Sequence, residues 1–173
     1  MRSGQMGVFR QPQQHSMKEA WIETCGYLTT GIYVLTSRHN DEMNGMIASW
    51  ISQVSYDPPL IVVAIHQNRS SHRLILKGGR FAVHILHARQ REFVSRFKGP
   101  DPRAKFEDVA WTEGLTGCPI LKECLGYLEC LTMENYRPGN HTLFVGKVVD
   151  AKILSPGEPM NSRDLDHVYL GKD

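Results

Sequence analysis

The sequence lacks the features that mark membrane-spanning, secreted or nucleic-acid-binding proteins. Its 20 basic and 18 acidic residues give a formal net charge of only +2 at pH 7. A charge this small and evenly spread predicts no nucleic-acid or membrane partner. No stretch reaches the ~18 apolar residues of a membrane helix, and the N-terminus has no apolar signal-peptide core. We therefore expect a cytoplasmic protein that binds neither nucleic acid nor a membrane.

Cysteine is sparse, and its spacing excludes the common metal and redox motifs. The four cysteines form no C-x-x-C pair, and no histidines stand at zinc-site spacing from them. Cys118, Cys124 and Cys130 recur at a regular interval, as in a metal or redox cluster. Pro119 and the strand-like run after it argue against convergence of the three thiols. We expect buried or half-buried free thiols and no metal site.

Several catalytic and nucleotide-binding motifs are also absent. The chain has no G-x-G-x-x-G fingerprint and no phosphate loop with Gly-Lys-Ser/Thr, which disfavours the common nucleotide-binding folds. It has no G-x-S-x-G elbow and no H-E-x-x-H helix, so hydrolase chemistry has no local support. The eight histidines are scattered, and for those inside strand-like runs, His66, His84 and His87, we expect structural roles.

The length of 173 residues and the 41% apolar content predict one domain with a hydrophobic core. Residues 1–16 show no periodicity and predict an N-terminal arm ahead of the domain, which we place at 17–173. Ser16 followed by Glu19 predicts a capping-box helix that ends near Gly26.

The rest of the chain is dominated by short strand patterns. Strands are expected at 31–37, 46–52, 60–66, 80–86, 126–136 and 141–154, the first two joined as a hairpin. Short helices are expected at 69–79, with a serine N-cap and a glycine C-cap, and at 89–97. The polar span 98–118 is long enough to suggest a functional loop. This pattern predicts a mainly β fold with short helices, built as an antiparallel barrel.

The stretch 68–74, "NRSSHRL", is the first candidate site. Two consecutive hydroxyls at a predicted helix start, together with free backbone N–H groups and the helix dipole, are suited to a phosphate. Arg69 and His72 could add charge-assisted hydrogen bonds. Plain helix capping explains the serines equally well.

The stretch 44–55, "NGMIASWISQVS", is the second candidate site. Small or polar residues recur along it: Gly45, Ala48, Ser49, Ser52 and Ser55. They would let a flat ligand approach the backbone, with hydroxyls to meet heteroaromatic edges. An edge strand with a solvated face is the alternative, and Trp50 fits that alternative poorly. His141, at the start of a predicted strand, is a candidate site residue only if it lies near these residues.

Taken together, these segments resemble the flavin reductase family, which has the FMN-binding split-barrel fold. The family's N-G-M-T-A-S-S-x-x-S-x-S-x-D-P-P strand corresponds to residues 44–59, and its hydroxyl cluster at a helix start to 70–72. Further counterparts follow in the family's order: 79–86, Lys105-Phe106, 117–121, Glu129-Cys130 and 139–146. The resemblance covers about residues 27–155.

The resemblance implies a six-stranded antiparallel split β-barrel, a homodimer, and one FMN, rather than FAD, per subunit. The strand lining the isoalloxazine would be Asn44, Gly45, Met46, Ile47, Ala48, Ser49, Trp50 and Ser52. Ser70, Ser71 and His72 would hold the phosphate, and Lys98 resembles a basic residue that some members place there. His141 would approach the flavin or the electron donor, where it could offset charge at the flavin N1–O2 edge. Tyr169 resembles an aromatic residue near the family's C-terminus that approaches the flavin.

The resemblance implies a reductase that passes electrons from NAD(P)H through FMN to a flavin, ferric or protein acceptor. The alternative is a flavoredoxin-type carrier with tightly bound FMN and little NAD(P)H oxidation of its own. Three departures bear on this choice: Ile47 replaces the usual Thr, Trp50 a small residue or Phe, and Asn140 an Asp. Trp50 favours the carrier, because it could cover the flavin face. A nucleic-acid-binding β-barrel is disfavoured by the near-neutral charge.

Overall fold

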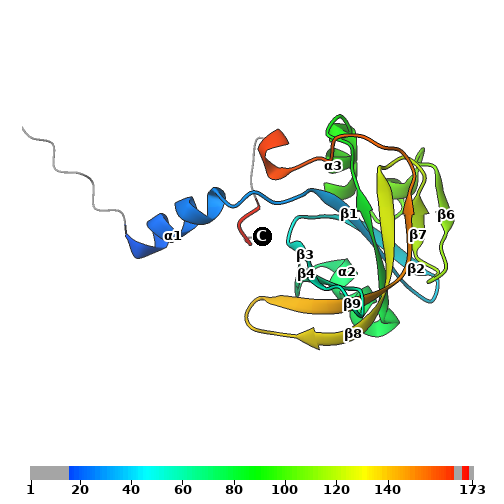
Figure 1. Cartoon of the computed structure of the whole chain (residues 1–173), viewed down its shortest axis with the longest axis horizontal. Helices are drawn as coiled ribbons and strands as arrows, with labels where there is room; N and C mark the ends of the chain where they lie inside the picture. Colours follow the sequence, from blue (N-terminus) through cyan, green and yellow to red (C-terminus); the bar gives the residue numbers. More distant parts are fainter. Residues whose placement is uncertain (1–15, 166–168, 172–173) are drawn as a thin grey trace, which may run out of the picture.

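The computed structural model describes residues 16–165 and 169–171, so the predicted arm at 1–16 lies outside them except for Ser16. Two antiparallel sheets dominate the fold (Figure 1). The large sheet has the order β2-β1-β5-β8-β9-β4-β3, and the small sheet pairs β6 with β7. The strands are β1 (Tyr33–His39), β2 (Glu42–Ala48), β3 (Ile51–Ser55), β4 (Leu60–His66), β5 (Arg80–Ile85), β6 (Trp111–Glu113), β7 (Pro119–Leu121), β8 (Gly126–Tyr136) and β9 (His141–Ile153). The mainly β fold class is confirmed.

The large sheet has seven strands, so the expected count of six is wrong. The difference arises at Ser49 and Trp50, where one expected strand divides into β2 and β3. These two strands form the opposite edges of the sheet, yet only two residues separate them in the chain. The sheet is therefore curled so that its edges are joined at this junction. The Trp50 carbonyl still accepts a hydrogen bond of 2.9 Å from the N–H of Ala64.

Side chains on the two faces of the sheet pack into separate clusters. Leu35 belongs to the cluster inside the barrel with Phe81 and Phe144, all of them fully buried. Its neighbour Val34 points the other way, as strand alternation requires, and packs with Phe97 in a second cluster. That second cluster fixes helix α3 against the barrel.

The helices are short: α1 (Met17–Gly26), α2 (Ser70–Gly78), α3 (Arg91–Lys98), and the 3-10 turns η1 (Ala104–Phe106) and η2 (Ser162–Asp164). The capping box of Ser16 and Glu19 is confirmed, and so is the glycine C-cap of α2, where Gly79 has φ 64°. The expected serine N-cap of α2 is wrong. Arg69 holds that position without a side-chain cap, and Ser70 is the first helical residue.

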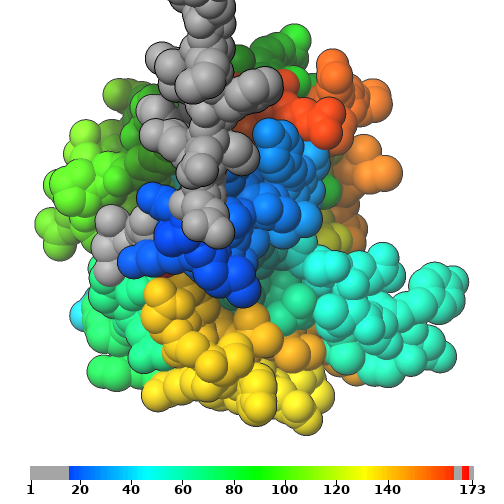
Figure 2. All heavy atoms as spheres, turned by 90° about the vertical axis from the view of Figure 1, so that its left-hand side faces the viewer, coloured from blue at the N-terminus to red at the C-terminus, as the bar shows by residue number. Residues whose placement is uncertain are grey.

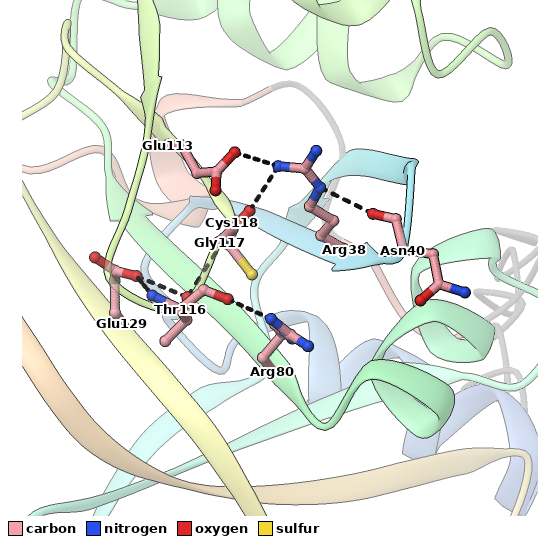
Figure 3. A network of polar contacts seen from close by, with 8 residues as sticks. All are labelled: Arg38, Asn40, Arg80, Glu113, Thr116, Gly117, Cys118 and Glu129. Atoms are coloured by element: carbon pink, nitrogen blue, oxygen red, sulfur yellow. Dashed lines mark hydrogen bonds and ion pairs between the residues drawn. The ribbon is translucent and has the colours of Figure 1, made fainter.

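A polar network fixes the turn between β6 and β7 (Figure 3). The buried carboxylate of Glu129 accepts hydrogen bonds from the backbone N–H of Thr116, at 2.7 Å, and from its hydroxyl, at 2.6 Å. Arg80 donates to the carbonyl of Thr116, and Arg38 donates to the carbonyl of Gly117. The carboxylate thus binds a backbone N–H group of the turn, and the two guanidinium groups bind its carbonyl oxygens.

The cysteines are free, as expected: Cys25 is half-buried and the other three are buried. Burial raises the thiol pKa of Cys118 and of Cys124 to about 11, and that of Cys130 to about 12. Within residues 16–165 and 169–171, no three His, Cys, Asp or Glu side chains are grouped as metal ligands. No helix in this part of the chain is long and apolar enough to cross a membrane.

Candidate functional site

A cavity of about 550 Å³ lies where the β2–β3 junction meets the starts of α2 and β9, the end of α3 and the C-terminal residues. Its volume falls in the range of small-molecule and cofactor sites. Its wall includes apolar, polar and basic side chains. Ten of the residues predicted for the site line it: Asn44, Met46, Ile47, Ala48, Ser49, Trp50, Ser70, Lys98, His141 and Tyr169.

The strand entering the β2–β3 junction supplies one continuous wall. Residues 46–50 all line the cavity, although successive side chains of a regular strand alternate between its faces. The chain leaves regular pairing after Ala48, and its backbone therefore forms part of this wall together with the side chains. A flat ligand could approach the main chain closely here.

The cavity has basic residues at one end and no acidic residue in its described lining. Arg69, Lys98 and Lys105 all border it. Lys105 is only 6% exposed, and its ammonium donates hydrogen bonds to the Asn44 Oδ1, at 3.1 Å, and to the Gly45 carbonyl, at 2.9 Å. Burial lowers the pKa of Lys105, the charge of nearby Arg69 lowers it further, and Asp101 opposes the shift. An anion bound at this end would neutralise part of the positive charge of these side chains.

Lys105 belongs to the Lys105-Phe106 counterpart of the family pattern but not to the predicted site. Its hydrogen-bond partners Asn44 and Gly45 lie about 60 residues earlier in the sequence, so spacing alone could not bring them together. The only local signal is a lysine directly before Phe106, which is itself buried. Ser162, near the C-terminus, is a second cavity residue without a sequence signal.

Two residues of the expected phosphate cluster lie behind the cavity wall. Ser71 is fully buried, and its hydroxyl accepts a hydrogen bond of 3.0 Å from Asn44 Nδ2. His72 is buried with its Nε2 2.8 Å from the Thr142 hydroxyl. Burial lowers the pKa of His72, and the charges of Arg137 and His66 lower it further. Of the predicted cluster, only Ser70 lines the cavity.

Gly45 and Ser52 also lie away from the cavity lining. A Cβ on Gly45 would come within 2.5 Å of the ring of Phe97, so the glycine makes room for α3, although its carbonyl holds Lys105. Ser52 is exposed on β3, and its hydroxyl donates to the carbonyl of the adjacent Gln53.

An aromatic and histidine cluster also borders the cavity. The ring centroids of Trp50 and His141 are 4.6 Å apart, and those of His66 and His141 are 4.9 Å apart. His66 and His141 face each other across the β4–β9 pairing. The Tyr169 hydroxyl is 3.1 Å from His141 Nε2, and Asn140 Oδ1 is 2.8 Å from His141 Nδ1. Both ring nitrogens of His141 therefore have a partner.

Comparison with known proteins places this architecture among flavin enzymes. The family model described as "Flavin reductase like domain" matches residues 25–166. The ferric-chelate reductase (NAD(P)H) of Archaeoglobus fulgidus is 29% identical over 87% of this chain and 92% of its own length. The high molecular weight rubredoxin of Moorella thermoacetica is 33% identical over 83% of this chain.

Among solved structures, the NADH:FAD oxidoreductase SgcE6 of Streptomyces globisporus, in complex with NAD and FAD fragments, superposes with a TM-score of 0.77. It is 28% identical, and the match covers 84% of this chain and 87% of that one. The chain spans only part of several curated relatives: 65% of the rubredoxin, and 23% to 27% of five longer flavoproteins.

Proposed function

Because the chain belongs to the flavin reductase-like family of oxidoreductases, we propose that it binds FMN and passes electrons from NAD(P)H to a flavin, ferric or protein acceptor. The observation that carries this proposal is the cavity itself. It combines a wall of strand backbone, a basic end with a buried lysine, and no acidic residue in its described lining. These features fit a flat ring joined to a phosphate.

The basic end would hold the phosphate. Lys105 is a buried ammonium that two carbonyl oxygens position. Ser70 adds a hydroxyl at the start of α2, where the helix dipole and free N–H groups favour an anion. Arg69 and Lys98 line the same cavity and would supply further charge-assisted hydrogen bonds. Ser71 would act indirectly by orienting Asn44.

The wall at 46–50 would hold the ring. FMN when bound supplies the redox chemistry, accepting a hydride from the nicotinamide and releasing electrons to an acceptor. The chain's own part is to bind and orient it, with backbone groups at the ring edge and Trp50 at one side. His141 would offset negative charge on the ring. Its contacts with Asn140 and Tyr169 fix its orientation in advance.

A flavoredoxin-type carrier remains the second candidate, and Trp50 is the observation that favours it. Trp50 contacts both His141 and Tyr169, so its ring occupies one edge of the cavity and would hinder a nicotinamide that stacks there. Rapid mixing of the FMN-loaded protein with NADH or NADPH separates the candidates. Fast bleaching of the flavin absorbance supports the reductase, whereas bleaching only by a reduced protein partner supports the carrier.

We also propose a homodimer, and two exposed apolar surfaces support it. Helix α1 has no buried residue and stands away from the barrel (Figure 1), with Met17 and Trp21 exposed. An isolated helix of this length is marginal in water. Figure 2 shows the α1 surface (blue) and the β8–β9 turn (yellow to orange) on the same face, and β8 exposes Leu131 and Met133. A second copy could cover both surfaces by two-fold symmetry.

Sedimentation velocity tests the dimer: the wild type should sediment as a dimer, and a Trp21→Ala, Met133→Glu variant as a monomer. For the cofactor, the test is an absorption spectrum of the purified protein, followed by chromatographic identification of the flavin released on heating. FMN supports the proposal. Release of FAD would mean that the site binds the cofactor named for SgcE6 instead of FMN. A protein that binds no flavin would contradict the proposal.

A further inference from the structure

The C-terminal residues Tyr169–Gly171 contact the aromatic edge of the cavity. The Tyr169 hydroxyl is 3.1 Å from His141 Nε2, and the ring centroids of Tyr169 and Trp50 are 5.4 Å apart. Asn140 Nδ2 donates a hydrogen bond of 3.3 Å to the carbonyl of Gly171. The partners come from the β2–β3 junction and the start of β9, so the segment bridges two parts of the cavity rim.

Among the described residues, few contacts hold Tyr169–Gly171 in place. Within the described part of the chain, residues 169–171 make no backbone–backbone hydrogen bond. The segment's polar contacts with described residues are made to His141 and Asn140, and it packs against the rings of Trp50 and His141. Segments with so few backbone hydrogen bonds open at a free energy well below that of global unfolding. The segment can therefore leave the rim while the barrel stays folded.

The surface formed by Trp50 and His141, which we call the seat, fits this segment closely at Gly171. Gly171 has φ 81°, a conformation that other residues rarely adopt, and an added Cβ would lie 2.8 Å from Trp50 Cη2 and 3.4 Å from His141 Cε1. Trp50 stands where the resembled family pattern has a small residue or Phe. The bulky ring thus provides a surface on which a residue without a side chain can rest.

We propose that Tyr169–Gly171 is a displaceable cover of this cavity edge, seated on Trp50 and His141, whose opening controls the entry and release of the flavin. The inference rests on the proposed function for the identity of the ligand. The seat itself consists of contacts within this chain. A closed cover slows passage in both directions, so loosening it should accelerate binding and release together.

The seat can be tested without any ligand. In a Trp21→Phe, Trp111→Phe background Trp50 is the only tryptophan, and acrylamide quenching of its fluorescence reports its exposure. Gly171→Ala and Tyr169→Phe should each raise the quenching constant roughly twofold, because the cover is open more often. The matched controls are Gly139→Ala, where an added Cβ meets nothing within 4 Å, and Tyr56→Phe at an 89% exposed tyrosine. Unchanged quenching in both test variants would overturn the cover.

The controlling role is tested by FMN kinetics in the wild-type background. Gly171→Ala, at a residue outside the cavity lining, should raise the association and the dissociation rate constants of FMN by similar factors, about three- to tenfold, with Kd nearly unchanged. An increase in the dissociation rate alone, with a matching rise in Kd, would overturn the cover. Failure of the wild type to bind FMN would contradict the proposed function, while the quenching result still decides the cover.

Discussion

Lys105 and Asn44 lie 61 residues apart in the sequence, yet the lysine ammonium donates a 3.1 Å hydrogen bond to the Asn44 side-chain oxygen. This bond fixes the Asn44 amide so that its nitrogen donates to Ser71. A buried cation, an amide and a hydroxyl thus form one chain of contacts that runs from the cavity lining, at Lys105 and Asn44, to the buried Ser71. The arrangement explains why an anion should stabilise this end of the site.

Replacing Lys105 by methionine should weaken FMN binding by about 10- to 100-fold, the range for losing a hydrogen bond to a charged group. Riboflavin binding should change by less than about twofold, because riboflavin has no phosphate. Fluorescence titration of both ligands measures the effect. The matched control is Lys122→Met at an exposed lysine. Equal losses for both ligands would show that Lys105 only supports the wall.

Ser70 and Ser71 should differ, although they are neighbours. Ser70→Ala should weaken FMN binding by roughly fivefold with little change in stability, because Ser70 lines the cavity. Ser71→Ala removes the acceptor of the Asn44 amide and should lower the free energy of unfolding by about 1–3 kcal/mol. Urea denaturation and FMN titration of both variants check this. A larger affinity loss in Ser71→Ala would restore it to the phosphate site.

Glu129→Gln should lower the free energy of unfolding by about 1–3 kcal/mol. The carboxylate is 1% exposed and accepts bonds from two backbone N–H groups and one hydroxyl, and a neutral amide would make these bonds weaker and turn one acceptor into a donor. Glu134→Gln, at an exposed glutamate of β8, is the control for urea denaturation. Equal stability of the two variants would contradict the role given to the turn network.

Stability should fall as the pH drops from about 6.5 to about 4. His84 is fully buried, and burial lowers its pKa to about 4, against the opposing effect of its bond to the Val34 carbonyl. Its Nε2 has no hydrogen-bond partner among the described residues. Below pH 6.5 His84 therefore binds a proton in the unfolded chain but stays neutral in the folded protein. This difference lowers the free energy of unfolding by up to ~3 kcal/mol at pH 4.

The measurement is urea denaturation of the wild type and of His84→Gln at several pH values. The variant should lose most of this pH dependence, whereas His39→Gln, at a half-buried histidine outside the core, should keep it. A wild-type unfolding free energy that does not change between pH 6.5 and 4 would contradict the neutral state of His84.

Most strands and the start of α1 were predictable because their signals are local, whereas the short strands β6 and β7 were not. The strand pattern at 31–37 predicted β1, and Ser16 with Glu19 marked the start of α1. The division of one strand at Ser49–Trp50 was not predictable, because it depends on closure of the whole sheet. The serine pair at 70–71 looks alike in sequence, but successive helical residues point in different directions, so only Ser70 reaches the cavity. Lys105 needed the fold to meet Asn44.

The most direct test of the central claim is a titration of the ligand-free protein with FMN and with riboflavin, at one pH and ionic strength. The two ligands share the ring system and differ in the phosphate, which the basic end around Lys105 should recognise. FMN should bind at least about 100-fold more tightly than riboflavin, because its phosphate adds two or more charge-assisted hydrogen bonds. Equal affinities, or no binding of either ligand, would contradict it.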